Sequence, residues 1–178
     1  MKRGLKICFV GGSQAGVIGA LTLLSQHHCI ISSVSYFEEL TRLLKRLKVP
    51  VYSSINSKDF LRALNDSDVL ISIHGREIVK SEQLAMPRIG CFNAHPYLYK
   101  YKGADPVGRA LKEKNFKASV GIHEMGPKAD EGKVLVEEFL DVSGANTVEE
   151  IYNRLYPCYS LVLLKALAII LAKKRLSK

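Results

Sequence analysis

Short apolar runs and amphipathic segments alternate along the first half of this chain of 178 residues. The clearest run, DVLISI at residues 68–73, has the continuous apolar character of a strand that is buried on both faces. Most of these runs are followed, after a turn, by a segment whose apolar residues recur at helical spacing. An order of β-α-β-α-β-α-β at such distances predicts a parallel, doubly wound sheet.

The whole chain, residues 1–178, is therefore expected to form a single α/β domain with a Rossmann-like, largely parallel twisted sheet and helices on both faces. No internal repeat or long linker interrupts it. Ser13 is expected to cap the first helix. Pro157 should kink or split the long C-terminal helix. Strands are expected at 6–10, 29–34, 49–52, 68–73, 89–94, 118–125 and 134–142, and helices at 13–26, 37–47, 58–64, 106–114 and 147–174.

The chain is basic, with 26 Lys and Arg against 17 Asp and Glu and a net charge of +9. This charge favours anionic partners such as nucleic acid, phosphorylated metabolites or a polyglutamate tail, and it does not choose among them. A basic nucleic-acid-binding module without catalysis therefore remains an alternative at this point. Strong salt dependence of its binding would identify it.

The four cysteines form no CxxC pair and no zinc spacing, which favours a reducing, cytoplasmic compartment. Cys8, Cys29 and Cys91 lie in apolar runs and are expected in the core. The longest apolar stretch, residues 158–172, is interrupted by Lys165 and is shorter than the roughly 18 residues of a membrane span, so no membrane association is expected.

The sequence GGSQAG at residues 11–16 follows the first strand and opens a helix. It is neither GxGxxG nor a P-loop, and no acidic residue ends the second strand, which disfavours a nucleotide-binding oxidoreductase. The segment is expected to form a tight turn, and its backbone amides could also bind an anion.

Asn93 and His95 stand two residues apart at the end of an expected strand, so their side chains should project on the same side. Asp130 lies in a later loop that could return to the same edge of the sheet. An amide, an imidazole and a carboxylate together can perform acyl transfer to an amine. A metal site from His74, His95 and His123 is conceivable, but no local pair of these has ligand spacing, so no metal is expected.

Two segments resemble signatures of the folate-dependent formyltransferases. Residues 92–106, FNAHPYLYKYKGADP, are similar to the family's Asn-x-His-x-Ser-Leu-Leu-Pro-x-x-Arg-Gly-x-x-Pro signature. Residues 121–135, GIHEMGPKADEGKVL, resemble its Gly-x-x-x-His-x-Met-x-x-x-x-Asp-x-Gly-x-Ile segment with small shifts. The similarity covers nearly all of residues 5–150.

The resemblance implies an enzyme that transfers a formyl group from 10-formyltetrahydrofolate without a metal. Asn93, His95 and Asp130 fall on the family's catalytic residues: Asn93 and His95 would hold the oxyanion while the amine attacks, and Asp130 would manage the proton. The resemblance also implies a folate pocket made by two loops. Its expected residues are Gly75, Arg76, Glu77, Ile78, Val79, Gly126, Pro127, Lys128 and Ala129.

The chain departs from the family pattern at several positions. Tyr97 replaces the Ser after His-Pro, Tyr-Lys at residues 99–100 replaces Leu-Pro, and Lys102 replaces Arg, which removes a bidentate fork. Arg76 and Glu77 stand in a pocket loop that is mostly apolar in the family.

The expected acceptor is a primary amine on a small or nucleotide-linked molecule. It is expected to be anionic, because the chain is basic. Gln14-Ala-Gly16 stands where the purine enzyme carries a phosphate-binding Gly-Ser-Asn, which argues against glycinamide ribonucleotide. The chain is also expected to lack the second domain of the methionyl-tRNA enzyme and the regulatory domain of the hydrolase. Methionyl-tRNA formyltransferase-like, glycinamide ribonucleotide formyltransferase and formyltetrahydrofolate hydrolase activities stay as alternatives.

Overall fold

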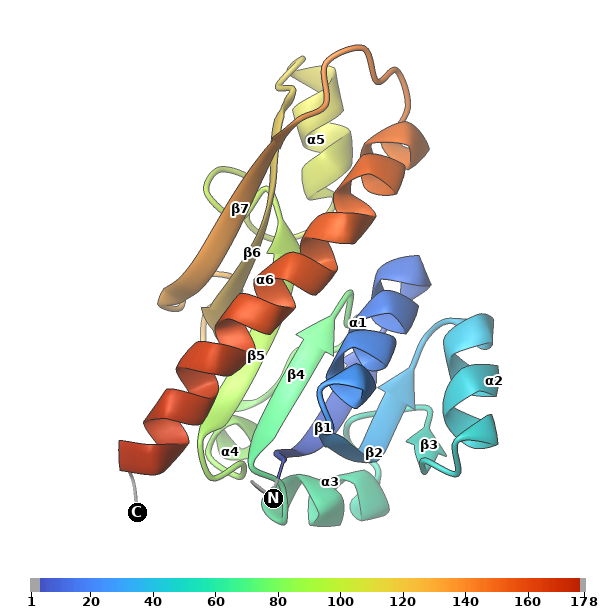
Figure 1. Ribbon diagram of the computed structural model, residues 1–178, viewed down its shortest axis with the longest axis vertical. Coiled ribbons are helices and arrows are strands. Elements are labelled where there is room, and N and C mark those ends of the chain that lie inside the picture. Colours follow the sequence, from blue (N-terminus) through green and yellow to red (C-terminus); the bar gives the residue numbers. More distant parts are fainter. Residues whose placement is uncertain (1–3, 177–178) are drawn as a thin grey trace.

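One seven-stranded sheet forms the centre of the molecule, in the order β3-β2-β1-β4-β5-β6-β7 (Figure 1). The computed structural model describes residues 4–176, and residues 1–3 and 177–178 lie outside this part. Strands β1 to β5 pair in parallel, and β6 and β7 add in antiparallel orientation at one edge. The strands are β1 (Lys6–Gly11), β2 (Cys29–Ser35), β3 (Val51–Tyr52), β4 (Val69–Ile73), β5 (Gly90–Pro96), β6 (Lys117–Glu124) and β7 (Val134–Asp141).

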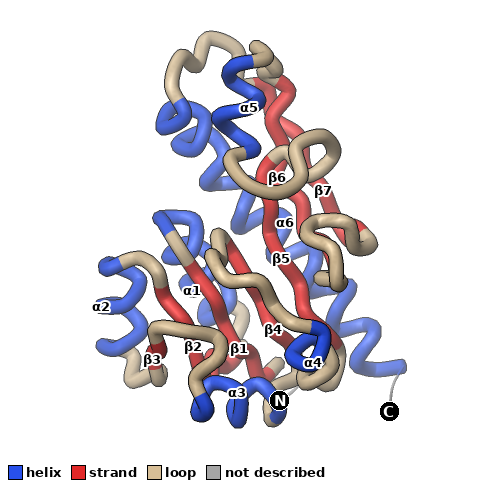
Figure 2. The backbone as a smooth tube through the Cα atoms, turned by 180° about the vertical axis from the view of Figure 1, so that it is seen from behind, coloured by secondary structure: helices blue, strands red, loops and turns tan. Residues whose placement is uncertain are grey.

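Helices cover both faces of the sheet. The long α6 and α1 lie on the face turned to the viewer in Figure 1, and α3 and α4 lie on the face seen in Figure 2. This arrangement confirms the predicted Rossmann-like fold class with its long C-terminal helix. Only the short α4 was not predicted. The helices are α1 (Ser13–Ser25), α2 (Glu38–Arg46), α3 (Lys58–Asn65), α4 (Ser81–Leu84), α5 (Pro106–Lys112) and α6 (Val148–Leu176).

Two apolar clusters, one on each face, hold the helices to the sheet. Alternation along β1 supplies both: Ile7 and Phe9 belong to the cluster that α1, α2 and α6 cover, and Cys8 and Val10 belong to the cluster that α3 covers. These four side chains are at most 3% exposed. The continuous apolar run that predicted a strand buried on both faces therefore has its structural reason here.

Helix α6 continues through Pro157 without a break, so the expected split is wrong. Leu155 and Tyr159, on either side of the proline, are both fully buried in the main core. Because most helical stability in proteins comes from packing of one face, this burial keeps the two halves in one helix.

Two smaller expectations also need correction. Gly12, and not Ser13, is the N-cap of α1, while Ser13 begins the helix with a φ of 55°. The Ser13 hydroxyl still accepts a hydrogen bond from the N–H of Ala15, at 3.3 Å. Cys29 is exposed and not in the core, because it is the first residue of β2. Cys8 and Cys91 are buried as expected.

Helix α6 is long and apolar enough over Val148–Ala172 to cross a bilayer, by length and composition alone. The sequence prediction against a membrane span considered only the shorter apolar stretch at residues 158–172. In the folded chain this helix packs on the sheet, with Ile151, Val162 and Ile170 fully buried in the main core. A core helix satisfies the same criteria of length and hydropathy as a membrane span.

Candidate active site

Strand β5 places Asn93 and His95 on one face of the sheet, near its carboxyl end. Phe92 and Ala94 of the same strand belong to the core under α1 and α6, and Cys91 belongs to the core under α3. Because side chains alternate along a strand, Asn93 and His95 share the face of Cys91. The two side chains thus project to the same side, as their spacing predicted.

The carboxylate of Asp130 reaches both of these side chains from the loop between β6 and β7. Its Oδ1 accepts a hydrogen bond from Asn93 Nδ2 at 3.2 Å, and its Oδ2 lies 3.4 Å from His95 Nδ1. The backbone N–H of Gly103 donates to Oδ2 at 2.9 Å. The three side chains proposed from the sequence therefore form one cluster.

His123 is a fourth member of this cluster. It lies directly opposite Asn93 in the antiparallel pairing of β5 and β6. Its Nε2 is 3.1 Å from Asp130 Oδ1 and 3.4 Å from Asn93 Nδ2. The sequence suggested His123 only as a conceivable metal ligand near the site. Antiparallel pairing of the two strands would have placed it here, but their register could not be derived from the sequence.

Backbone carbonyls fix the protons on both imidazoles. His95 Nε2 lies 2.8 Å from the carbonyl oxygen of Tyr101, and His123 Nδ1 lies 2.8 Å from that of Glu124. Because a carbonyl only accepts, each of these nitrogens must donate. A neutral His95 ring then turns the lone pair of its Nδ1 toward the carboxylate of Asp130. The carboxylate and this nitrogen are two neighbouring acceptors that can receive a proton.

The site is a base at neutral pH. Burial raises the pKa of Asp130, but its contacts with His123, His95 and the Gly103 N–H outweigh burial and bring that pKa to about 2. Burial is also the largest influence on His95, and it lowers the pKa of this imidazole against the opposing effects of Asp130 and the Tyr101 carbonyl. A carboxylate therefore stands beside a neutral imidazole.

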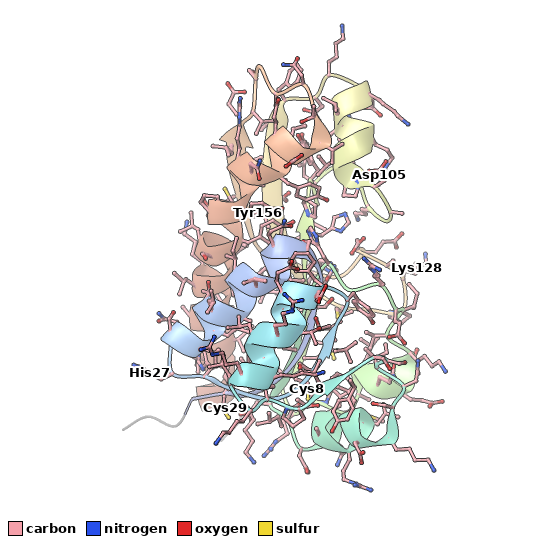
Figure 3. The ribbon with its side chains drawn as sticks, turned by 90° about the vertical axis from the view of Figure 1, so that its right-hand side faces the viewer. Cys8, His27, Cys29, Asp105, Lys128 and Tyr156 are labelled. Atoms are coloured by element: carbon pink, nitrogen blue, oxygen red, sulfur yellow. The ribbon has the colours of Figure 1, made fainter. Side chains whose placement is uncertain are left out.

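A cavity of about 420 Å³ opens beside the cluster, and Asn93, His95, Asp130 and His123 contribute to its wall. Asp105 and Lys128, which also line it, lie on the same side of the molecule in Figure 3. Both loops of the expected folate pocket contribute residues. These are Gly75, Glu77, Ile78, Val79, Gly126, Pro127, Lys128 and Ala129.

Arg76 does not line the cavity, although the sequence placed it in the pocket. Its guanidinium carbon instead lies over the ring of Tyr36, 5.7 Å from the ring centre. Other lining residues were not singled out from the sequence, because they come from strand ends, from the segment before α5 and from α6. They include Ser72, Gly103, Ala104, Pro106, Met125 and Tyr152.

His74 also lines the cavity but stays apart from the Asp130 cluster. Its Nδ1 lies 2.9 Å from the Ser13 hydroxyl, and its Nε2 lies 2.6 Å from the hydroxyl of Tyr159. Burial lowers the pKa of His74 to about 4, so this ring is neutral. Within residues 4–176, no group of three or more His, Cys, Asp or Glu side chains is arranged to hold a metal ion.

The sequence profile of the formyl transferase family matches residues 42–167, well over half of the chain. The chain belongs to the formyl transferase family. The matched part contains β4 to β7 and most of α6, and hence the whole Asp130 cluster.

Individual relatives agree with this membership. The methionyl-tRNA formyltransferase of Thermotoga maritima is 32% identical over 106 residues, which are 57% of this chain and 34% of that protein. The chain thus spans about a third of the length of this curated relative. A glycinamide ribonucleotide transformylase from Symbiobacterium toebii superposes with a TM-score of 0.77 at 18% identity, over 94% of this chain and 87% of that one. A sugar 3N-formyl transferase, solved in the presence of dTDP and 5-N-formyl-THF, gives a TM-score of 0.74 at 16% identity, over 93% and 62%.

Two buried tyrosines lie in the segment after His-Pro, and each is fixed by a hydrogen bond from its hydroxyl. Tyr97 is fully buried, and its hydroxyl donates to the carbonyl of Asn115 at 3.1 Å. Tyr101 is 4% exposed and donates from its hydroxyl to Glu113 at 2.6 Å. The side chain of Tyr101 thereby anchors the carbonyl that orients the imidazole of His95. Of these two residues only Tyr97 departs from the family pattern, and the core accommodates it.

Gly132 is expected to be essential for the position of Asp130. A Cβ atom at Gly132 would lie 1.7 Å from the backbone oxygen of Glu124, so the loop would have to move. Gly132→Ala is expected to lower the single-turnover rate by about 10²-fold, the cost of displacing a reacting group by about 1 Å. Lys133→Ala, at the exposed neighbouring position, is the control. Equal rates in the two variants would show that the loop adapts without moving Asp130.

Proposed function

We propose that this chain transfers a formyl group from 10-formyltetrahydrofolate to a primary amine. The observation that carries the proposal is the contact of the Asp130 carboxylate with Asn93, His95 and His123 at the wall of the cavity. Membership of the formyl transferase family supports the reaction class. The matched region includes all four of these residues, which supports their assignment to one catalytic centre.

The donor would bind between the two loops of the cavity. Ile78, Val79, Met125 and Pro127 give this part an apolar wall, and the segment around Gly126 offers backbone groups. A flat heterocycle with hydrogen-bonding edges fits such a slot. A solved relative with this fold was crystallised in the presence of 5-N-formyl-THF, which supports a reduced folate as the ligand class.

In the proposed mechanism, Asn93 donates from its side-chain amide to the formyl oxygen as that oxygen gains negative charge. The Asn93 amide carries two hydrogens: one bonds to Asp130 at 3.2 Å, and the other faces His123 Nε2 at 3.4 Å, a longer contact that the formyl oxygen would replace. Asp130 accepts the proton that the attacking amine loses, directly or through one water molecule. A proton taken up at His95 Nδ1 forms an ion pair with Asp130 and places positive charge near the oxyanion. When the tetrahedral intermediate collapses, the bond between the formyl carbon and the donor nitrogen breaks, and the proton taken from the amine passes to that nitrogen, which gives an N-formyl product and tetrahydrofolate.

The acceptor we propose is an amine on a small or nucleotide-linked molecule, in the cytoplasm. Asp105 and Tyr152 also line the cavity and belong to neither of the two folate loops, so they offer a wall for an acceptor. Relatives act on chemically different amines, as the names methionyl-tRNA formyltransferase and sugar 3N-formyl transferase state. The acceptor class is therefore a matter for direct assay.

Titration with a stable 10-formyltetrahydrofolate analogue tests the proposal first, and a screen of amine acceptors for formylated product tests it second. Saturable binding followed by formyl transfer to an amine is the expected result. Formate release without transfer would identify a hydrolase instead. Absence of folate binding, together with salt-dependent binding of DNA or RNA, would replace the proposal by a nucleic-acid-binding function.

Ile78→Asp is expected to weaken binding of the folate analogue by at least tenfold, or about 1.4 kcal/mol. Ile78 is 75% exposed and lines the cavity, so a charge there meets the ligand without disturbing the core. Leu47→Asp, at a site 47% exposed and away from the cavity, is the matched control. Fluorescence or calorimetric titration of both variants gives the comparison. Unchanged affinity in Ile78→Asp would remove this loop from the folate site.

A further inference from the structure

The carboxylate of Glu77 is turned into a set of four hydrogen-bond donors. Its Oε1 accepts from the Tyr36 hydroxyl at 2.6 Å and from the Ile55 N–H at 3.1 Å. Its Oε2 accepts from the Ser54 hydroxyl at 2.7 Å and from Asn56 Nδ2 at 3.0 Å. Both oxygens therefore already have partners within the protein.

These donors come from two other connections at the same edge of the sheet. Tyr36 follows β2, and residues 54–56 lie between β3 and α3. Glu77 itself lies between β4 and α4, so one side chain joins three connections. A carboxylate that accepts from several fixed donors forms stronger bonds than a neutral acceptor does.

Gln83 of α4 fixes the other end of the segment that begins at Glu77. Its Nε2 donates to the carbonyl of Ile55 at 3.2 Å and to Asn56 Oδ1 at 3.3 Å. Its Oε1 accepts from the N–H of Lys80 at 2.9 Å. The residues between Glu77 and Lys80 are therefore held at both ends against the segment between β3 and α3.

Ile78 and Val79 occupy this clamped stretch and line the cavity. Val79 is 9% exposed and packs in the core under α3, whereas Ile78 is 75% exposed. An exposed isoleucine has little packing of its own to fix its place. Its position beside the cavity thus depends on the bonds that hold its neighbour.

We propose that Glu77 is a positioning residue for the folate donor: its carboxylate fixes the 75–80 segment and so presents Ile78 to the ligand. This inference rests on the proposed function, because it assumes that this segment contacts the donor. It also gives Glu77 a different role from the one expected from the sequence, since the carboxylate acts through the loop and not by contact with the folate.

The carboxyl group of Glu77 is ionised at neutral pH. Burial raises the pKa of this carboxyl, but the hydrogen bonds from Tyr36, Ser54, Ile55 and Asn56 together outweigh burial and lower its pKa below the ordinary value. An uncharged amide at this position would keep the shape of the side chain. It would bring N–H groups to a place that is already filled by donors.

Three variants of the full chain test the proposal, with Glu82→Gln as control. Glu77→Gln removes the charge, and Tyr36→Phe and Ser54→Ala each remove one donor outside the cavity wall. Glu82 is an exposed carboxylate of α4 outside the cavity wall. For a stable folate analogue we expect the Kd to rise about tenfold in Glu77→Gln. We expect smaller rises of the same direction in Tyr36→Phe and Ser54→Ala, and no change in Glu82→Gln.

Two further measurements separate positioning from direct contact. At saturating donor, kcat of Tyr36→Phe and Ser54→Ala should stay within about twofold of the wild type, because both residues lie outside the cavity wall and the Asp130 cluster is untouched. Hydrogen exchange of the amides of residues 75–80 should become faster in Glu77→Gln without any folate present. In the Glu77→Gln/Tyr36→Phe double variant the effects on Kd should not add, since both changes break one network.

The outcomes distinguish this inference from the proposed function. If the wild type does not bind the analogue, the proposed function fails. If the wild type binds and Glu77→Gln behaves as Glu82→Gln does, the positioning role is overturned. A weaker Kd in Glu77→Gln with wild-type values in Tyr36→Phe and Ser54→Ala also overturns it, because Glu77 would then contact the ligand itself. If Glu77→Gln fails to fold, Tyr36→Phe and Ser54→Ala decide the question alone.

Discussion

Asp130→Asn is expected to abolish formyl transfer almost completely while the protein still binds the folate analogue. The substitution keeps the shape of the side chain and its acceptor for the Gly103 N–H, but it removes the negative charge that takes the proton from the amine. It also points an NH₂ group at neighbours that already include an amide donor, Asn93. Loss of a positioned general base costs about 10²–10⁴ in rate, and we expect the upper end of this range.

Single-turnover formyl transfer at saturating donor measures this effect without a contribution from product release. Glu131→Gln is the matched control, because Glu131 is the adjacent carboxylate and pairs only loosely with Lys128, at 3.7 Å. Full activity in Asp130→Asn would mean that the proton leaves by another route, even with the family assignment unchanged.

Asn93→Ala is expected to lower the single-turnover rate by about 10²–10³, the usual cost of removing one oxyanion donor. His95→Ala should cost at least as much, because it removes both the imidazole that pairs with Asp130 and the positive charge that this ring can carry. Folate binding should change far less than the rate in both variants. These losses would identify the side chains as acting in the transition state and not in ground-state binding.

The double variant His95→Ala/Asp130→Asn makes this prediction specific. Residues that act on one transition state give losses that do not add, so the double variant should be scarcely slower than the slower single variant. A control pair of distant, exposed residues such as Glu82 and Leu47 should show independent, small effects. Fully additive losses for His95 and Asp130 would mean that they do not belong to one site.

The fold could be predicted from the sequence wherever the local pattern and the tertiary environment agree. Continuous apolar runs such as residues 68–73 predicted strands buried on both faces, and β4 is such a strand. Alternation within one strand was sufficient to place Asn93 and His95 on the same side. Pro157 is the opposite case, because burial of its neighbours in the core outweighs its local preference, and no sequence window contains that information.

The site was harder to predict because its members come from different elements. The meeting of Asp130 with Asn93 depends on the return of β6 and β7 to the same edge, which the order of the strands allowed but which the resemblance to a family made specific. His123 depends on a register between two strands. The orientation of Glu77 depends on three loops at once, so a residue chosen as a ligand contact has both of its oxygens bonded within the protein.

Strand β5 is the seam where the parallel and antiparallel parts of the sheet join, with β4 on one side and β6 on the other. The segment after β4, which we propose to hold the donor, belongs to the first part, and Asp130 is carried by the hairpin connection of the second. In this proposal, donor binding and proton transfer therefore depend on two separate connections, the one after β4 and the one between β6 and β7. Substitution or lengthening of the β6–β7 connection should change proton transfer and the access of water to the formyl group without changing the affinity of the segment after β4 for the folate. Donor recognition and reaction outcome in this fold can in this way diverge independently under selection.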